Sequence, residues 1–298
     1  MKKSFLLLAV ASMMAVFASC EKPEPDPEGL TTVANAFSVA AGKQVLLAPG
    51  NLQHRPSVNA WRFAPNAWDA CMEDNVMASP EFDDWIDNFG WATSGHEGYL
   101  GSLASSSNSN YYHGGSINGT EYDWGQHNAI QNGGATDPAG TWRTLTQEEW
   151  EYLINQREAS TVAGTANARY LFCTVHGQTG LLLFPDQFEY PEGLQGINPS
   201  HINTPDQYSN YLYSQTDWER LKEAGCAFLP AAGCRLVLGN NPSMISMDFL
   251  GAYWTATYAG TGDPGYMANQ LAFSPSICEI GTVGIQFGRC VRLAKDVK

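Results

Sequence analysis

The pattern of apolar and polar positions is clearest between residues 142 and 158, which read WRTLTQEEWEYLINQRE. The side chains that recur at helical spacing and share one face are Trp150, Leu153, Ile154 and Arg157. Thr146 and Glu149 stand at the start of this segment with the spacing of a capping box. We therefore predict a helix that begins at Thr146 and packs this face inward.

Two further segments have weaker helical patterns. TDWERLKEAG, residues 216–225, has apolar positions at helical spacing, and we expect Thr216 to cap this helix and Gly225 to end it. FDDWIDNFGW, residues 82–91, places aromatic residues at mixed spacing, and we expect a short helix that ends near Gly90.

Short runs of alternating apolar residues predict strands elsewhere in the chain. They lie in residues 35–64, in a hairpin that turns at residues 176–178, and in the later stretches FLPAAGCRL, AYWTATY, MANQLAF and RCVRLA. Residues 101–140 are polar and glycine-rich with little periodicity, so we expect a long loop there. The helices are too few for a doubly wound sheet, and the pattern indicates an α+β fold with short strands.

The start of the chain has the features of an export signal. Two lysines and an apolar run precede Ala18 and Ser19, and the run is too short to span a bilayer comfortably. Small residues before Cys20 resemble a bacterial lipobox, in which cleavage leaves the cysteine as the acylated first residue. An ordinary signal peptide with a coincidental cysteine is the alternative.

This reading divides the chain into three parts. Residues 1–19 are a lipoprotein signal peptide, and residues 20–34, which contain EKPEPDPEG, are an acidic proline-rich tether that cannot bury apolar surface. Residues 35–298 are then a single domain. We expect the mature protein to be anchored by lipid at Cys20 to the bacterial outer membrane, facing the cell surface.

Charge and cysteine usage restrict the partners and the chemistry. With 16 basic and 30 acidic residues the chain has a formal net charge of −14, which disfavours nucleic acid and limits membrane contact to the lipid anchor. There is no C-x-x-C motif, so neither a redox motif nor a zinc knuckle is indicated. The cysteines after Cys20 allow either disulfides or buried free thiols, and they are Cys71, Cys173, Cys226, Cys234, Cys278 and Cys290.

Several motifs together resemble one superfamily. WRTLTQEEWEYLINQR is similar to a helix of formylglycine-generating enzymes, which have a variant of the C-type lectin fold. FLPAAGCR, YWTATYAG, ANQLAF and GRCVRL resemble its closing strands in the same order, and resemble more closely the Fibrobacter-type major paralogous domain of bacterial lipoproteins. The resemblance runs from about Phe37 to Leu293. It implies a C-type lectin-like fold of the formylglycine-generating-enzyme type, with short twisted antiparallel strands, two or more helices and much irregular loop.

The chemistry of that superfamily is not expected to follow. Formylglycine-generating enzymes oxidise a protein cysteine with a close pair of cysteines that hold copper near the C-terminal end. Here the late cysteines are spaced by eight and by twelve residues and stand in different surroundings, so we expect no enzyme.

Metal motifs are also incomplete. His96-Glu97 opens like H-E-x-x-H, but Leu100 takes the place of the second histidine. His113, Asp123 and His127 match no standard site and are more simply solvated loop residues. We predict no cofactor, while calcium stays open for the Asn/Asp-rich turns, although the sugar-binding signatures of C-type lectins are missing.

A binding surface is the favoured interpretation for residues 251–293. Trp254, Leu271, Phe273, Val291 and Leu293 are expected core anchors on short strands, with positions of varied chemistry between them. This arrangement resembles the C-terminal variable region of proteins diversified by retroelements, which implies exposed side chains on a rigid frame. The candidate ligand-binding residues are Tyr258, Asp263, Tyr266, Gln270, Ser274, Glu279 and Gln286. The alternative is an ordinary last hairpin with unremarkable surface residues.

The sequence therefore favours a surface-anchored ligand-binding or adhesion lipoprotein whose partner is an unknown protein or glycan on a cell or host surface. One alternative is an oxidase of protein cysteines of the formylglycine-generating type. The other is a structural component of an outer-surface assembly.

Overall fold

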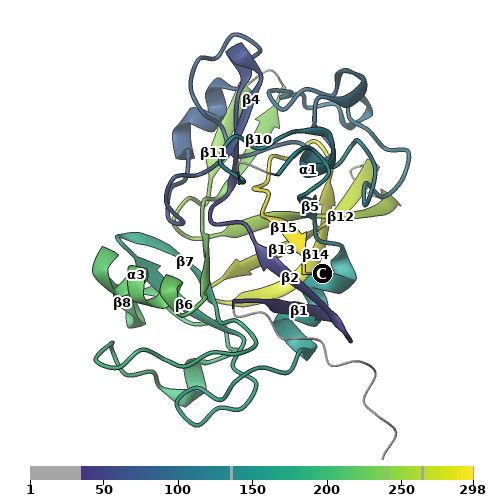
Figure 1. The fold of residues 1–298 in the computed structure, drawn as a ribbon. Helices are drawn as coiled ribbons and strands as arrows, with labels where there is room; N and C mark the ends of the chain where they lie inside the picture. Colours follow the sequence, from purple (N-terminus) through teal and green to yellow (C-terminus); the bar gives the residue numbers. More distant parts are fainter. Residues whose placement is uncertain (1–34, 135–136, 240, 263–264, 298) are drawn as a thin grey trace, which may run out of the picture. The chain divides into compact units, whose positions relative to one another are not determined.

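The computed structural model describes residues 35–134, 137–239, 241–262 and 265–297 (Figure 1). These residues belong to one compact unit. No helix among them has both the length and the apolar character needed to cross a membrane. The predicted signal peptide, Cys20 and the tether lie outside the described residues.

The described strands form five sheets. One four-stranded sheet has the order β1 (Phe37–Ala40), β2 (Lys43–Leu47), β15 (Leu293–Asp296) and β5 (Arg143–Thr144). The other has the order β8 (Leu212–Tyr213), β6 (Tyr170–Val175), β7 (Gln178–Leu183) and β9 (Ala227–Pro230). The three-stranded sheet is a meander of β12 (Gly251–Gly262), β13 (Gly265–Ser274) and β14 (Ile277–Gly284). The two-stranded sheets pair β3 (Leu52–Arg55) with β4 (Ala60–Phe63), and β10 (Cys234–Leu238) with β11 (Asn241–Ile245).

Helices are few and short. The α-helices are α1 (Trp124–His127), α2 (Gln147–Glu151) and α3 (Gln215–Glu223). A π-helical turn, η5 (Tyr152–Gln156), continues α2. The 3₁₀ turns are η1 (Pro56–Val58), η2 (Met72–Met77), η3 (His96–Gly98), η4 (Asn108–Asn110), η6 (Pro199–His201) and η7 (Tyr208–Asn210). The fold is thus mixed α+β, with mostly short antiparallel strands and much irregular structure; β6 and β8 pair in parallel.

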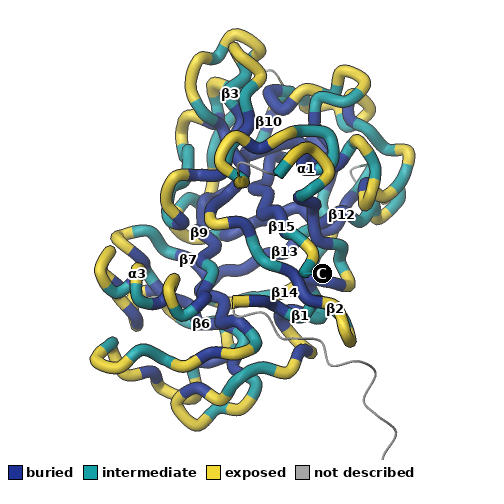
Figure 2. Tube along the Cα trace, viewed as in Figure 1, coloured by how far each residue is buried: buried dark blue, intermediate teal, exposed yellow. Residues whose placement is uncertain are grey.

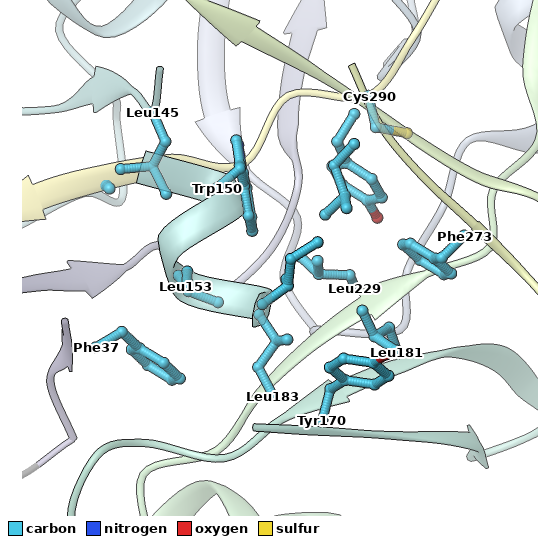
Figure 3. Packing of buried hydrophobic residues seen from close by; sticks show 14 of the residues in the cluster. Phe37, Leu145, Trp150, Leu153, Tyr170, Leu181, Leu183, Leu229, Phe273 and Cys290 are labelled. Carbon is cyan, nitrogen blue, oxygen red and sulfur yellow. The ribbon is translucent and has the colours of Figure 1, made fainter. Parts of the chain in front are cut away.

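The helix predicted after Thr146 is confirmed together with its cap. The side chain of Thr146 accepts a hydrogen bond from the backbone nitrogen of Glu149 at 3.3 Å, and Glu149 accepts one from the backbone nitrogen of Thr146 at 2.9 Å. Trp150 and Leu153 are buried as expected. In Figure 3 their side chains lie among those of the strands around them, with Leu183 of β7 close to the end of the helix.

Two helix predictions need correction. Residues 82–91 contain no helix, because Ile86 pairs with His54 and Phe89 pairs with Arg289 as extended backbone. The second helix, α3, is capped by Ser214 rather than by Thr216, which lies inside the helix. Gly225, with a φ of 93°, follows its end as expected.

The first half of β12 and the second half of β13 are covered on both faces, whereas β14 is mostly half-buried or exposed. Tyr253, Leu271 and Phe273 point into one apolar cluster with Trp150, whereas the alternate residues Trp254 and Ala268 point into a second cluster. A third cluster lies around β6, β7 and α3. In Figure 2 burial is concentrated in the middle of the molecule, where the first half of β12 and the second half of β13 lie. The expected core anchors Trp254, Leu271, Phe273, Val291 and Leu293 are all fully buried.

Candidate functional site

The candidate ligand-binding residues of the meander differ widely in exposure. Tyr258, Tyr266 and Gln270 are half-buried, and Glu279 is exposed. Asp263 lies outside the described residues. Ser274 and Gln286 are buried, with exposed fractions of 5% and 6%, so the expectation that they are displayed is wrong.

Different contacts bury these two residues. The second half of β13 is covered on both faces and has no solvent side on which Ser274 can be displayed, whereas Gln286 lies beyond the end of β14. Ser274 ends β13 directly after the buried Phe273, and its hydroxyl accepts a hydrogen bond from the backbone nitrogen of Ser276 at 3.4 Å. The side chain of Gln286 lies over Gly284, where a Cβ would come within 2.5 Å of its Oε1.

Gln270 is half-buried because it has a structural partner. Its Oε1 accepts a hydrogen bond from Nε of the buried Arg289 at 2.5 Å. Of the candidate ligand-binding residues that the structure describes, Tyr258, Tyr266 and Glu279 are therefore at least partly accessible and have no comparable side-chain hydrogen bond.

Tyr258 and Tyr266 connect to aromatic residues of the long loop. Tyr258 lies 5.7 Å from Trp91 between ring centroids, and Trp91 lies 6.2 Å from Tyr112. Tyr266 stacks on His113 at 3.9 Å with an angle of 11° between the ring planes. We call the aromatic surface the set of half-buried rings at this end of the meander: Tyr99, Tyr112, His113, Tyr122, Tyr258 and Tyr266.

Stacking also orders the loop part of the aromatic surface. Tyr112 and Tyr122 stack at 3.6 Å with an angle of 17°, and Tyr99 lies 6.1 Å from Tyr112. The hydroxyl of Tyr122 donates to Glu97 at 2.5 Å, and this hydrogen bond raises the pKa of Tyr122 to about 12. The phenol therefore stays protonated at neutral pH and acts as a hydrogen-bond donor.

Backbone contacts fix the loop on the meander. The backbone nitrogen of Ile117 donates to the carbonyl oxygen of Ala256 at 2.9 Å, and the backbone nitrogen of Tyr258 donates to the hydroxyl of Ser116 at 3.0 Å. Asp123 caps α1 and is fully buried, where it accepts hydrogen bonds from the backbone nitrogen and hydroxyl of Thr144, both at 2.8 Å. Burial raises the pKa of Asp123 to about 6. The loop is therefore ordered by its own anchors.

The structure groups the histidines of this region differently from the sets considered in the sequence. Asp123 accepts hydrogen bonds from Thr144, and His113 stacks on Tyr266. The set of His113, Asp123 and His127 therefore does not form a metal site. Among the described residues, the one group of three His, Cys, Asp or Glu side chains placed to share an ion is His96, Glu121 and His127. Their ligand atoms all lie within 4.8 Å of one another.

The six described cysteines are unpaired. Burial raises the pKa of Cys226 and of Cys290 well above the ordinary thiol value, so both remain thiols at neutral pH. Cys226 lines a cavity of about 290 Å³ together with the apolar side chains of Phe37, Trp142 and Trp218. A buried, protonated thiol in an apolar wall is a poor nucleophile and a poor copper ligand.

The sequence reasoning missed the loop half of the aromatic surface. Tyr112 and Tyr122 stand in the segment that the sequence predicts only as a polar loop, and Tyr99 stands just before it. One signal was available: tyrosines occur in a stretch with little apolar periodicity. Packing of a strand or helix face does not explain such residues, so they are candidates for a surface role. No family model matches this chain, and no curated protein or solved structure matches it either, so the resemblance to the formylglycine-generating enzymes and the lipoprotein domain rests on the sequence motifs.

Proposed function

We propose that this chain is a non-enzymatic, surface-anchored lipoprotein that binds a ligand through the aromatic surface. In this proposal Cys20 carries the lipid, residues 20–34 are the tether, and the body is a C-type lectin-like frame of the formylglycine-generating-enzyme type. The lipid anchors the chain to the outer membrane, and the frame presents the aromatic surface toward the cell exterior.

The observation that carries the proposal is the continuity of the aromatic surface. Tyr258 and Tyr266 come from the meander, and Tyr112 and Tyr122 come from the long loop, with Tyr99 just before it. Ring contacts and backbone hydrogen bonds join these segments. Tyrosine offers a large contact area at a low cost in conformational entropy, and rings that are ordered before binding lose less entropy on binding.

A protein ligand is favoured over a glycan. Stacking between Tyr112 and Tyr122, and between Tyr266 and His113, covers one face of each ring, which leaves fewer open faces for a sugar ring. Partly exposed tyrosines beside polar loops are typical of protein interfaces. Diversification of the meander by a retroelement remains part of the proposal for Tyr258, Tyr266 and Glu279, and a neighbouring reverse-transcriptase gene with a matching template repeat would support it.

The thiols argue against the oxidase alternative. Copper(I) in such a site needs two thiolates close together, whereas the late cysteines are spaced by eight and by twelve residues and stand in different surroundings. An assay of a cysteine-containing peptide with added copper tests this alternative directly, and we expect no aldehyde product.

A binding experiment with whole cells tests the main proposal. Fluorescently labelled protein is applied to a panel of bacterial and animal cells, and bound protein is measured by flow cytometry. We expect the double variant Tyr258→Ala/Tyr266→Ala to bind at least about tenfold more weakly than the wild type, as truncation of interface hot spots does. Leu212→Ala, at an exposed position of β8 in the third cluster's region, is the matched control and should bind normally.

Pretreatment of the cells distinguishes the ligand classes. Protease treatment should abolish binding, whereas removal of glycans should leave it unchanged. Unchanged binding by the double variant would contradict the role of the aromatic surface, and sensitivity to deglycosylation alone would identify a glycan ligand instead.

A further inference from the structure

Two imidazoles and one carboxylate converge at the edge of the long loop. Nδ1 of His96 lies 3.3 Å from Oε2 of Glu121, and the ring centroids of His96 and His127 are 5.4 Å apart. The ligand atoms of all three residues lie within 4.8 Å of one another. Ligands of a tetrahedral zinc ion at the usual bond lengths are about 3.3–3.5 Å apart, so His96 and Glu121 already have this separation and the third ligand needs only a small side-chain adjustment.

The backbone segments that carry these residues are tied together by Ser94. The hydroxyl of Ser94 donates to the carbonyl oxygen of Glu121 at 2.7 Å. The side chain of Asn128, next to His127, donates to the carbonyl oxygen of Ser94 at 2.8 Å. Contacts of this kind orient metal ligands in advance and reduce the cost of bringing them together.

An ordinary ion pair accounts for only part of this arrangement. It would explain His96 and Glu121, but within the described part of the chain the imidazole of His127 has no side-chain hydrogen-bond partner and only a ring contact with His96. A shared cation would use all three groups.

The surrounding charge also favours a cation. No lysine or arginine occurs in the sequence between Arg62 and Arg143, although this stretch contains many acidic residues. Among the described residues neither Glu97 nor Glu121 has a lysine or arginine ion-pair partner. A divalent cation would reduce the repulsion in this region.

From this geometry we propose that His96, Glu121 and His127 bind one zinc ion. Two imidazole nitrogens and one carboxylate oxygen suit zinc, whereas calcium and magnesium prefer sites made of oxygen ligands. Three protein ligands leave a fourth position for water or for a donor group of another molecule. The inference does not rest on the proposed ligand-binding function, although His96 also contacts Tyr122 of the aromatic surface, with ring centroids 4.8 Å apart.

Calorimetric titration of the untagged full-length chain with zinc chloride tests the site. We expect one zinc ion per chain with a Kd of about 1 μM or tighter at about pH 7.5. Affinity should fall at about pH 5.5, because protons compete with the metal for imidazole. Calcium chloride should produce no saturable heat.

Matched variants assign the ligands. His96→Ala and His127→Ala should each weaken zinc binding by about tenfold or more, while His113→Ala should leave zinc affinity unchanged. The thermal midpoint gives a second readout: zinc should raise it for the wild type and for His113→Ala, but not for His127→Ala or the size-preserving His127→Gln.

Three results would overturn the proposal. One is a Kd weaker than about 100 μM for the wild type. Another is zinc binding that survives in both His96→Ala and His127→Ala, which would assign it to other groups such as the cysteines. The third is an equal loss of affinity in His113→Ala.

Discussion

Truncation of Trp254 tests the division of the meander into buried frame and accessible contacts. The indole is fully buried in the second apolar cluster, and its Nε1 donates to the carbonyl oxygen of Phe89 at 2.7 Å. Trp254→Ala leaves a cavity that costs about 3–5 kcal/mol and removes a buried hydrogen bond worth about 1 kcal/mol more. The total of about 4–6 kcal/mol is a large share of the roughly 5–15 kcal/mol that stabilises a typical domain.

Urea unfolding followed by far-ultraviolet circular dichroism measures this loss. Trp254→Phe retains most of the apolar volume but not the hydrogen bond, so we expect an intermediate loss of about 1–2 kcal/mol. Glu279→Ala, at an exposed position of β14, should change the free energy of unfolding by less than about 0.5 kcal/mol. The reasoning is refuted if Trp254→Ala costs less than about 1.5 kcal/mol, or if Glu279→Ala costs as much as Trp254→Ala.

Further predictions concern buried groups and the helix cap. Burial lowers the pKa of His54 from 6.5 to about 4, so the folded chain keeps this imidazole neutral and should lose up to about 3 kcal/mol of stability as the pH falls from about 6.5 to about 4. Urea unfolding at about pH 7 and about pH 4.5 measures how the free energy of unfolding changes with pH. This change should be smaller in His54→Phe, and an equal change in that variant would disprove the assignment to His54. Ser214→Ala removes the capping box of α3 and should lower the free energy of unfolding by about 0.5–2 kcal/mol, measured by thermal unfolding. Thr216→Ala should lower it by less than about 0.5 kcal/mol. The reverse order would identify Thr216 as the cap. Because the described cysteines are unpaired, a reducing agent should leave the thermal midpoint unchanged. Iodoacetamide should alkylate Cys226 and Cys290 only in the unfolded chain, as measured by mass spectrometry. Rapid alkylation of the native chain would contradict their burial.

Local signals explain which elements could be predicted from the sequence. The cap of α2 depends on two residues of one turn, so Thr146 and Glu149 were sufficient. At α3 both Ser214 and Thr216 have an acidic residue three positions later, and the sequence does not decide between them. Residues 82–91 form extended backbone because their partners, His54 and Arg289, come from distant segments.

The candidate site was predictable only in part. Tyr258 and Tyr266 are partly accessible near the turn between β12 and β13, although both also pack against the second apolar cluster. Ser274 lies where both faces of the sheet are covered, and alternation along one strand cannot show what covers it. The convergence of His96 with Glu121 depends on hydrogen bonds of Ser94 across the loop, so no spacing motif reports it.

The position of β15 makes one sheet depend on a pairing between distant parts of the chain. β15 lies between β2 and β5, and Arg292 just before it donates to the carbonyl oxygen of Ala48, 244 positions earlier in the chain. Until β15 docks, one edge of β2 and the edge of β5 that it covers are unpaired and can join other chains. Such distant pairing slows folding, so we expect these edges to stay open to association until residues 293–296 are in place.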